Sequence, residues 1–405
     1  MTVTKSFTVV GAGIVGAAVA RELASRFPDS TVTLLEKEAQ VASHQSGHNS
    51  GVVHAGLYYQ PGGLKAQLCR RGAQLLEDYC LARELPYEQC GKLVVALDEA
   101  EARHLGEMFE RAKKNGVPGV RMVDGAGIRE IEPNAIGISA LHSPTTAIVD
   151  YAAVTRSLTN DLVELGGRVE LNCEVYDIAP SNSGVILQTS QGDRETDFVI
   201  VCAGLQSDRI ARLAGGARNP SIIPFFGQYF RLDEKHKDIL NGLVYPVPDP
   251  KFPFLGVHLT KRVDGEMLVG PNAFLSPSRE VYRGLGLNLR DLAETLMDRG
   301  FLNFARNNLP SAVREGRTVL SKTFFLREAQ KYVPSLEGAN VTRLTRGIRA
   351  QAMDADGSLV DDFRIDYEAR VTHVRNAPSP GATSSMAIAE FIVAGMVEKH
   401  EALQV

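Results

Sequence analysis

The chain of 405 residues lacks several features, and each absence excludes a class of protein. No uncharged apolar run reaches the roughly eighteen residues that a membrane-spanning helix needs. The first residues do not combine a basic segment with an apolar one, so we expect no signal peptide. Basic residues are not in excess, since 44 Lys and Arg stand against 48 Asp and Glu, for a formal net charge of −4. That balance argues against a nucleic-acid-binding protein, which usually presents a basic face.

Cysteine is also scarce. The five cysteines are an odd number, are widely spaced and form no C-x-x-C pair: Cys69, Cys80, Cys90, Cys173 and Cys202. This usage indicates buried free thiols in a reducing compartment. We therefore expect a cytoplasmic protein, and peripheral attachment to the inner face of a membrane stays open. Hydrophobic residues at 44% and charged residues at 23% are typical of a globular chain, and the length suits two or three domains.

Among the features that are present, the first is a βαβ unit over residues 5–36. The apolar strand SFTVV is followed by GAGIVG, by a segment with helical spacing, and by a second strand that ends at Glu36. Gly11 permits a tight turn, Gly13 lets the backbone approach a pyrophosphate, and Gly16 lets helix and strand pack closely. Glu36 stands where a carboxylate can bind the hydroxyls of a ribose. The spacing predicts a dinucleotide site with the diphosphate at the helix N-terminus.

The buried strand in DFVIVCAG also runs into Ala203 and Gly204, where a ligand can approach the backbone closely. Two features favour FAD over NAD as the dinucleotide. The stretch 44–59 lies directly after the ribose-binding acid, where an extended chain can follow a bound cofactor inward. The turn at residues 377–384 opens a closing helix whose N-terminus can face the electron-rich edge of a reduced flavin. NAD enzymes do not require that second helix end, although NAD stays open on the residues alone.

These nucleotide-binding signals lie at both ends and in the middle of the chain. The sequence therefore predicts an α/β (α+β) fold, with an FAD-binding Rossmann-like domain interleaved with an antiparallel-sheet substrate domain. The FAD-binding domain is expected over 1–80, 148–219 and 340–405, and the substrate-binding domain over 81–147 and 220–339. Further helices are expected at 64–83, 287–307 and 320–331.

The stretch HQSGHNSGVVHAGLYY, residues 44–59, is too rich in glycine and polar residues for a core strand. Its histidines, His44, His48 and His54, lack the compact spacing of a zinc site, and no acidic residue lies within the stretch, so we expect no metal. Its serines lack the strand–turn–helix elbow of a G-x-S-x-G nucleophile. The composition instead favours a loop whose backbone N–H groups converge on a phosphate or a flavin edge.

Three segments, GAGIVG with Glu36, VIVCAG and HVRNAPSPGATSS, together resemble the D-amino-acid-oxidase-type flavoprotein superfamily, which also contains glycine oxidase, sarcosine oxidase and FAD-linked glycerol-3-phosphate dehydrogenase. Longer strings resemble the L-2-hydroxyglutarate dehydrogenase/oxidase family more specifically: SGHNSGVVHAGLYY, QCGKLVVA, YPVPDPKFPFLGVHLT, GPNA, RAQAMDADGSLVDDF and HVRNAPSPGATSS. The resemblance covers nearly the whole chain, with little signal at 276–330. It implies FAD as cofactor and the oxidation of L-2-hydroxyglutarate, a small dicarboxylic 2-hydroxy acid, to 2-oxoglutarate.

The resemblance also implies which residues bind the cofactor, with the segment from Ser46 to Asn49 passing the diphosphate and the flavin. The expected set is Gly11, Gly13, Ile14, Val15, Gly16, Glu36, Lys37, Ser46, Gly47, His48, Asn49, Val175, Ala203, Gly204, Pro378, Gly381, Ala382 and Thr383.

Oxidation of a 2-hydroxy acid needs a hydride acceptor, which the flavin supplies, and a base for the hydroxyl proton. A largely neutral histidine suits the base, and the candidates are His54 and His258. Either of them could instead be a hydrogen-bonded core histidine, so the identity of the base stays open.

The reaction also needs cations for the carboxylates. Arg349 in RGIRAQ and Arg375 in HVRN resemble the substrate-carboxylate arginines of the glycine oxidase branch, and one of them could instead form a structural ion pair. Tyr58, Tyr59 and Lys92 are further candidates for substrate binding.

Two stretches, residues 287–305 and 320–332, combine apolar faces with interspersed basic residues. We expect them to pack on the substrate domain; the alternative is that one contacts a membrane, which would suit electron transfer to a quinone. The acceptor, oxygen or a quinone, stays open. Two alternative functions also remain: a related FAD oxidase of another 2-hydroxy acid or an amino acid, and a non-catalytic flavin-binding protein.

Overall fold

The computed structural model describes residues 5–248, 256–271, 273–283, 286–306, 321–344, 346–400 and 403. Residues 249–255 and Asn272, which belong to two of the strings quoted above, lie outside the described residues. So do residues 307 and 320, at the ends of two expected helices.

One half of the molecule is built on a six-stranded sheet with the order β22-β23-β13-β1-β2-β9. Neighbouring strands are parallel except at the edge, where β22 is antiparallel to β23. The strands are β1 (Ser6–Val10), β2 (Thr31–Leu35), β9 (Arg168–Glu170), β13 (Phe198–Val201), β22 (Arg364–Tyr367) and β23 (Val371–Asn376). Both ends and the middle of the chain thus meet in one sheet, which confirms the predicted fold class.

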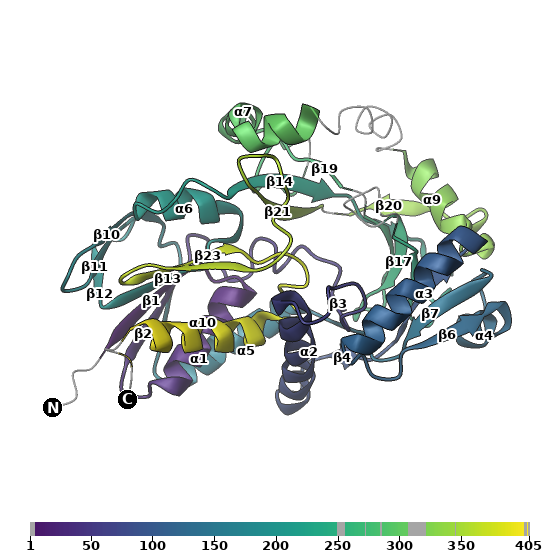
Figure 1. The fold of residues 1–405 in the computed structure, drawn as a ribbon, viewed down its shortest axis with the longest axis horizontal. Coiled ribbons are helices and arrows are strands. Elements are labelled where there is room, and N and C mark those ends of the chain that lie inside the picture. The colour runs from purple at the N-terminus through teal and green to yellow at the C-terminus, as the bar shows by residue number, and fades with distance from the viewer. Residues whose placement is uncertain are drawn as a thin grey trace.

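Helices cover one face of this sheet, and a small sheet covers the other. On the first face α1 (Ile14–Arg26) packs against α5 (Tyr151–Glu164) and α10 (Ser385–Lys399) (Figure 1). The alanines Ala17, Ala18 and Ala20 are buried, and small side chains let neighbouring helices approach α1 closely. The other face carries α6 (Ser207–Leu213) and a sheet of β10 (Val175–Pro180), β11 (Val185–Thr189) and β12 (Arg194–Thr196).

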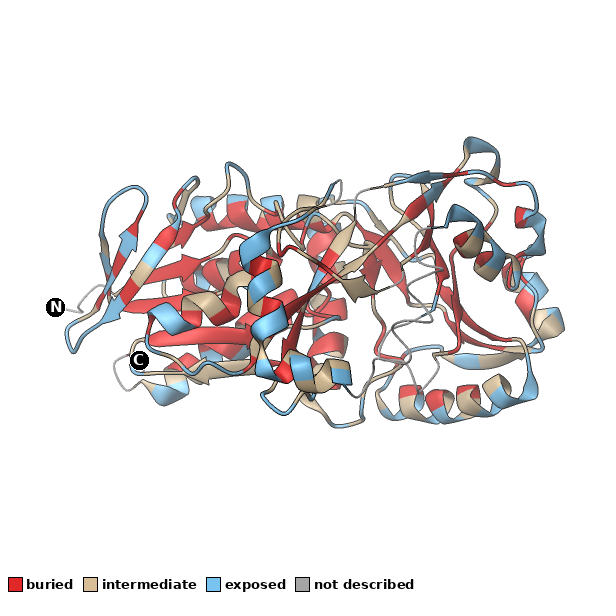
Figure 2. Ribbon diagram, turned by 90° about the horizontal axis from the view of Figure 1, so that it is seen from above, coloured by how far each residue is buried: buried red, intermediate tan, exposed pale blue. Residues whose placement is uncertain are grey.

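The other half is built on an eight-stranded sheet with the order β20-β15-β18-β17-β16-β5-β7-β6, antiparallel except for the parallel pair β16 and β5. Its strands are β5 (Lys92–Ala96), β6 (Arg121–Asp124), β7 (Ser139–Ser143), β15 (Phe230–Leu232), β16 (Leu243–Pro246), β17 (His258–Lys261), β18 (Met267–Gly270) and β20 (Val341–Arg343). The antiparallel substrate sheet expected from the sequence is therefore present. Figure 2 shows buried residues along the strands of both halves and exposed residues on the outer faces of the helices.

Three helices pack around the eight-stranded sheet: α3 (Glu99–Lys114), α4 (Gly125–Ile131) and α9 (Lys322–Gln330). Phe325 and Ala329 of α9 are buried against this sheet, so the second of the two basic and apolar stretches packs on the substrate domain as expected. Short 3₁₀ helices lie at Gly204–Gln206, Glu234–His236 and Pro334–Leu336. Among the described residues, no helix is long and apolar enough to cross a membrane.

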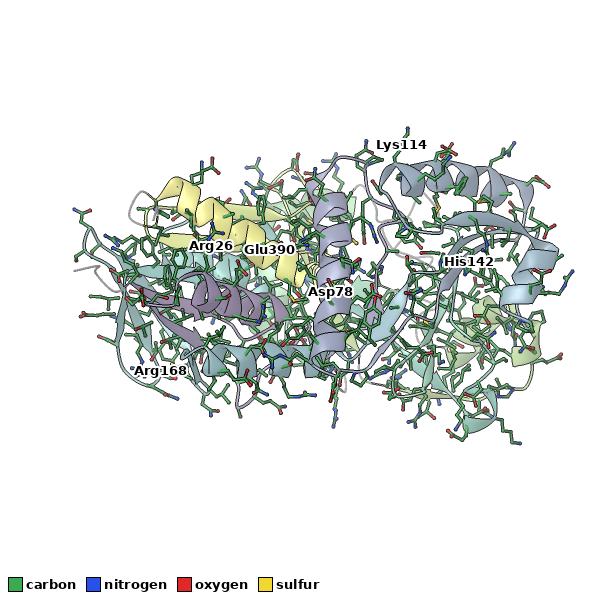
Figure 3. The ribbon with its side chains drawn as sticks, turned by 90° about the horizontal axis from the view of Figure 1, so that it is seen from below. Arg26, Asp78, Lys114, His142, Arg168 and Glu390 are labelled. Atoms are coloured by element: carbon green, nitrogen blue, oxygen red, sulfur yellow. The ribbon has the colours of Figure 1, made fainter. Side chains whose placement is uncertain are left out.

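Elements from both halves meet at the junction. One small sheet holds β19 (Phe274–Leu275), β14 (Ser221–Gly227) and β21 (Gly347–Met353), and another holds β3 (Val52–Val53), β8 (Ala147–Val149) and β4 (Tyr87–Glu88). Helix α2 (Leu64–Ala82) stands between the halves: Figure 3 places Asp78 of α2 between Arg26 and Glu390 on one side and Lys114 and His142 on the other. At the rim lie α7 (Leu289–Met297) and a helical segment over 299–306.

The predicted domain boundaries stay a prediction. Paired strands cross them at two places. β20 falls within 340–405, the range expected for the FAD-binding domain, yet it pairs with β15 of the eight-stranded sheet. β4 falls within 81–147 and pairs with β8, which spans the expected boundary near residue 148. The two halves are therefore joined by shared sheets as well as by connecting segments.

Candidate active site

A cavity of about 930 Å³ extends from the turn after β1 to strands β17 and β21. One end is lined by the glycine turn and Glu36, the middle by the loop over 43–50, and the other end by His54, Tyr229, Tyr245, His258 and Arg349. The turn before α10 lines it as well. This volume lies near the upper end of the usual range for ligand sites, roughly 300–1,000 Å³.

The three glycines of the turn have distinct surroundings. Gly11 has φ +101°, and a Cβ there would lie 2.6 Å from the Cys202 carbonyl oxygen; a Cβ on Gly16 would lie 1.9 Å from the Gly11 oxygen. Both positions therefore require glycine so that strand and helix can pack. Gly13 has an ordinary φ of −72°, and a Cβ there would meet only Ser46 Oγ, at 3.3 Å. Gly13 thus keeps the cavity open beside the start of α1.

Glu36 is held rigidly at the end of β2. The residue is 7% exposed, its Oε2 accepts the N–H of Ala12 at 2.7 Å, and its Oε1 accepts that of Glu38 at 3.0 Å. Each carboxylate oxygen keeps a further lone pair for a ribose hydroxyl. Nearby, Ser46 Oγ accepts the N–H of Ile14 at 2.8 Å and so caps the first turn of α1.

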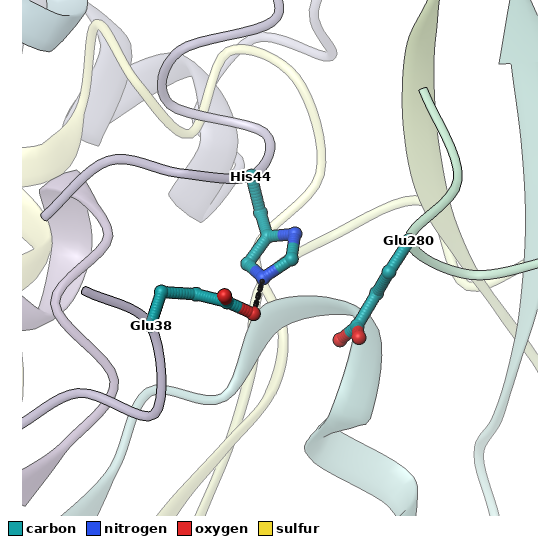
Figure 4. Close-up of side chains that lie close together, drawn as sticks. All are labelled: Glu38, His44 and Glu280. Carbon is teal, nitrogen blue, oxygen red and sulfur yellow. Dashed lines mark hydrogen bonds and ion pairs between the residues drawn. The ribbon is translucent and has the colours of Figure 1, made fainter. Parts of the chain in front are cut away.

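An ion-pair network joins this end of the cavity to the segment around Glu280. Glu38, His44 and Glu280 place possible ligand atoms within 4.8 Å of one another, and His44 Nε2 lies 2.9 Å from Glu38 Oε1 (Figure 4). However, the Lys37 ammonium binds both carboxylates, at 2.9 Å to Glu38 and 2.7 Å to Glu280. Because a cation already bridges the two carboxylates, the arrangement is that of an ion-pair network rather than a metal site. This network was not expected from the sequence, since both acids lie outside the 44–59 stretch.

The loop within 44–59 is folded on itself by Asn49. Its side-chain amide donates to the carbonyls of Gln45 at 3.1 Å and Ser46 at 2.7 Å, and its Oδ1 accepts the N–H of Gly51 at 2.9 Å. Gly47 packs against a neighbouring carbonyl, because a Cβ there would lie 2.4 Å from the Ala42 oxygen. The structure therefore places Gly47 outside the residues that line the cavity.

Hydrogen bonds tie this loop to the turn before α10. Thr383 Oγ1 accepts the N–H of His54 at 3.1 Å and lies 2.9 Å from the Tyr151 hydroxyl. Tyr151 in turn donates to the Val52 carbonyl at 3.0 Å, and Cys69 Sγ donates to the carbonyl of His54. The main-chain N–H and carbonyl of His54 are thus both hydrogen-bonded, which fixes this residue beside the second cofactor turn.

The structure brings both candidate histidines to the same end of the cavity, and both are neutral at pH 7. Burial lowers the pKa of His54 to about 3, and the nearby charge of Lys92 adds to the effect. Burial likewise lowers the pKa of His258 to about 4. His258 Nδ1 lies 3.0 Å from the Gly256 carbonyl, which can only accept, so Nδ1 carries the proton and Nε2 keeps a lone pair. Among the described residues, His54 Nδ1 has no hydrogen-bond partner.

Lys92 is a buried cation beside these histidines. It is 2% exposed, and its ammonium lies 5.0 Å from the ring centroid of Tyr58 and 4.8 Å from that of Tyr245. Within the described part of the chain the ammonium has no hydrogen-bond partner, and burial lowers its pKa to about 8. Aromatic faces compensate a desolvated cation only in part. The site therefore favours an anionic ligand.

Arg349 lines the cavity from β21, and burial lowers its pKa. Arg375 is also among the residues that line the cavity, but its guanidinium is engaged elsewhere. Its fully buried guanidinium donates to Asp366 Oδ2 at 3.2 Å and to the Ala217 carbonyl at 2.9 Å. Arg375 thus forms the structural ion pair that the sequence analysis left open for one of the two arginines, and its binding of a substrate carboxylate stays a prediction.

The cavity is lined by most of the expected cofactor residues: Gly11, Gly13, Ile14, Val15, Gly16, Glu36, Lys37, Ser46, His48, Asn49, Val175, Ala203, Gly204, Gly381, Ala382 and Thr383. Pro378 lines a smaller neighbouring pocket instead, and the ring of Tyr59 lies below the Lys65 ammonium. Sequence reasoning missed Tyr229 and Tyr245. The signal available for them was strand alternation in the aromatic-rich segment 220–275.

We predict that Gly13→Ala weakens FAD binding at least roughly tenfold, because its methyl group projects beside Ser46 Oγ into the expected path of the diphosphate. The fold should lose no more than about 1 kcal/mol, since the backbone at Gly13 suits alanine. FAD titration of the apo-protein measures this. The control is Gly106→Ala in α3, where a Cβ would meet nothing within 4 Å. Equal FAD affinity in the two variants would refute the assigned role.

Comparison with known proteins agrees with this geometry. The family model described as FAD dependent oxidoreductase matches residues 6–394. The mitochondrial L-2-hydroxyglutarate dehydrogenase of Nematostella vectensis is 45% identical, over 96% of this chain and 90% of the relative. The L-2-hydroxyglutarate dehydrogenase of Salmonella houtenae is 41% identical, over 96% and 92%.

Among solved structures, the FAD-bound L-alpha-glycerophosphate oxidase of Mycoplasma pneumoniae shares the fold, with a TM-score of 0.74 and 22% identity over 99% of this chain and 95% of that one. The chain therefore belongs to the FAD dependent oxidoreductase family and, within it, to the L-2-hydroxyglutarate dehydrogenase branch.

Proposed function

We propose that this protein oxidises L-2-hydroxyglutarate to 2-oxoglutarate with FAD. The observation that carries the proposal is the meeting of Arg349 and two neutral histidines at one end of a cofactor-sized cavity. The buried ammonium of Lys92 lies 4.8 Å from the ring of Tyr245, which lines the same end. A dicarboxylic hydroxy acid offers two anionic groups for the cations and a hydroxyl proton for a histidine. Relatives at 41–45% identity bear the name of this activity.

The residues present fit FAD. Gly13 leaves the start of α1 open to a diphosphate, Glu36 presents a fixed carboxylate for a ribose, and Gly204 adds a close backbone approach. When bound, FAD accepts the hydride from the α-carbon of the substrate.

In this proposal His54 takes the hydroxyl proton. Its main chain is bonded to Thr383 in the turn that lines the cavity before α10, which places the imidazole beside the second cofactor segment. Its low pKa keeps the ring unprotonated and ready to accept. His258 is the alternative acceptor, because its Nε2 lone pair is fixed by the Gly256 hydrogen bond.

Arg349 and Lys92 hold the two carboxylates. The planar guanidinium suits the carboxylate next to the reacting carbon, where orientation matters most, and the ammonium suits the distal one. Lys92 is buried, whereas Arg349 is exposed to the cavity that it lines, so a dianion can reach Arg349 directly and offset the desolvated charge of Lys92.

The activity and the base are tested together by anaerobic mixing of the FAD-loaded protein with L-2-hydroxyglutarate while the flavin absorbance is followed. We expect rapid bleaching by the L-isomer and none by the D-isomer. His54→Asn should slow bleaching by about 10²- to 10⁴-fold, as expected for loss of a general base. His236→Asn, at a partly exposed histidine paired with Asp233, is the control.

Equal rates for the two isomers, or an unchanged rate in His54→Asn, would contradict the proposal. A larger loss in His258→Asn than in His54→Asn would move the base to His258. Bleaching by other 2-hydroxy acids or amino acids in place of L-2-hydroxyglutarate would favour a related oxidase.

The role of Lys92 predicts a pH dependence. Its pKa of about 8 means that the ammonium is charged below that pH and neutral above it. Affinity for L-2-hydroxyglutarate should therefore fall as the pH rises through about 8, while His54, with a pKa of about 3, stays neutral throughout. Lys92→Met should bind weakly at every pH and lack this transition. The apparent Kd of flavin reduction from about pH 6 to about pH 10 measures both, and an identical profile in the variant would exclude Lys92.

We further propose a peripheral membrane contact through α7 and residues 299–306, with the protein on the cytoplasmic side and a quinone as electron acceptor. Helix α7 buries the polar residues Asp291 and Thr295. Five apolar residues of this region are exposed by 50–74%: Leu287, Leu289, Leu296, Met297 and Leu302. The arginines Arg290, Arg299 and Arg306 are exposed among them. An apolar surface with interspersed basic residues suits an anionic lipid headgroup layer.

Sedimentation with vesicles that contain anionic phospholipid tests this contact. We expect the protein to bind such vesicles, to bind neutral ones less, and to lose binding in the double variant Leu289→Gln/Met297→Gln. Leu81→Gln is the matched control, because Leu81 is 67% exposed on α2, at a distance from this surface. Unchanged vesicle binding in the double variant would refute the contact. Faster reoxidation of the reduced protein by air than by a water-soluble quinone would make oxygen the acceptor.

A further inference from the structure

A second pocket, of about 270 Å³, adjoins the end of the cavity that holds the candidate substrate residues. It is lined in part by Lys65, Gln351, Asp361, Pro378 and Ser379. Arg349 lines both this side pocket and the main cavity, so the two meet at this residue.

Lys65 and Asp361 both line the side pocket and form an ion pair there. Lys65 lies in the first turn of α2, and its ammonium donates to both the side chain and the carbonyl of Asp361, each at 2.8 Å. The lysine side chain is 11% exposed, whereas that of the aspartate is 91% exposed. The ammonium also lies 5.2 Å from the ring centroid of Tyr59. A mostly buried cation is thus paired with a carboxylate that stands in solvent.

The backbone around Asp361 is anchored, although its side chain is exposed. The amide of Asn376 donates to the carbonyls of Val360 and Asp362, each at 2.9 Å. Asn376 is the last residue of β23, and the second cofactor turn follows it. The Asp361 carboxylate can therefore leave Lys65 by rotation of its side chain alone, with the segment held in place.

We propose that the side pocket is the substrate entrance, and that Lys65 is a specificity-determining residue that exchanges Asp361 for a carboxylate of the incoming dicarboxylic acid. The inference rests on the proposed function. An ion pair with one solvent-exposed partner is weak, so a dianion can displace Asp361 from Lys65. The acid then passes from Lys65 to Arg349, which the two cavities share. Lys65 also contributes to the low pKa of His54, which agrees with its position near the reacting end.

The test measures anaerobic flavin reduction of the holoenzyme by L-2-hydroxyglutarate over a range of acid concentrations. Lys65→Gln should raise the apparent Kd roughly tenfold and weaken its dependence on salt, with the loss in Kd rather than in the limiting rate. Asp361→Asn should lower the apparent Kd by about two- to fivefold, because no side-chain carboxylate at position 361 then competes with the substrate for Lys65. Lys65→Arg keeps the charge and should restore the wild-type Kd. Substitutions of the two partners of this ion pair should therefore change the apparent Kd in opposite directions.

The matched controls are Arg71→Gln and Glu390→Gln. These variants break another ion pair of α2, in which Arg71 lies 2.9 Å from Glu390 of α10. Both should behave as wild type. Shifts of the same sign in Lys65→Gln and Asp361→Asn, or shifts no larger than in the controls, would overturn the entrance and leave the proposed function intact. Failure of the wild-type protein to be bleached by L-2-hydroxyglutarate would overturn the proposed function and the entrance with it.

Discussion

The chemistry of this site depends on one buried ammonium that is not fully compensated. Lys92 lies between two tyrosine rings, with its ammonium unbonded among the described residues, and Arg349 is exposed to the cavity nearby. Desolvated cations both attract a dianion and disfavour protonation of neighbouring imidazoles. The charges of Lys92 and Arg349 therefore help to keep His54 and His258 neutral. In the proposed function, substrate binding and proton abstraction share this electrostatic cause.

The interleaved fold is what holds those groups together. Lys92 comes from β5, His258 from β17 and Arg349 from β21, whereas His54 is bonded to Thr383 beside the parallel sheet. Helix α2 contacts the second turn closely: a Cβ on Gly72 would lie 2.5 Å from the Thr383 oxygen. The same helix carries Lys65 to the side pocket. A shift between the halves would therefore change the cofactor turn, the base and the proposed entrance together.

The sequence predicted the cofactor end of the site well, because local backbone geometry determines it. The glycine turn, Glu36 and the turn before α10 depend on short segments whose conformation glycine, proline and strand ends dictate. The substrate end was predicted less well, because side-chain direction depends on strand register. The guanidinium of Arg375 is engaged with Asp366, and the sequence did not show that Lys92 would be buried without a hydrogen-bond partner among the described residues. For α7 the tertiary contacts matter more than periodicity, since it buries Asp291 and exposes Leu289 and Met297.

The central claim is that the pocket recognises two carboxylates. The most direct measurement compares L-2-hydroxyglutarate with L-2-hydroxypentanoate, which has the same chain length and lacks the distal carboxylate, as reductants of the bound flavin under anaerobic conditions. One charge-assisted contact contributes about 1.5–3 kcal/mol, so the ratio of the limiting rate to the apparent Kd should be roughly 10- to 100-fold higher for the diacid. Equal ratios for the two acids would contradict the account, because Lys92 would then hold no substrate carboxylate.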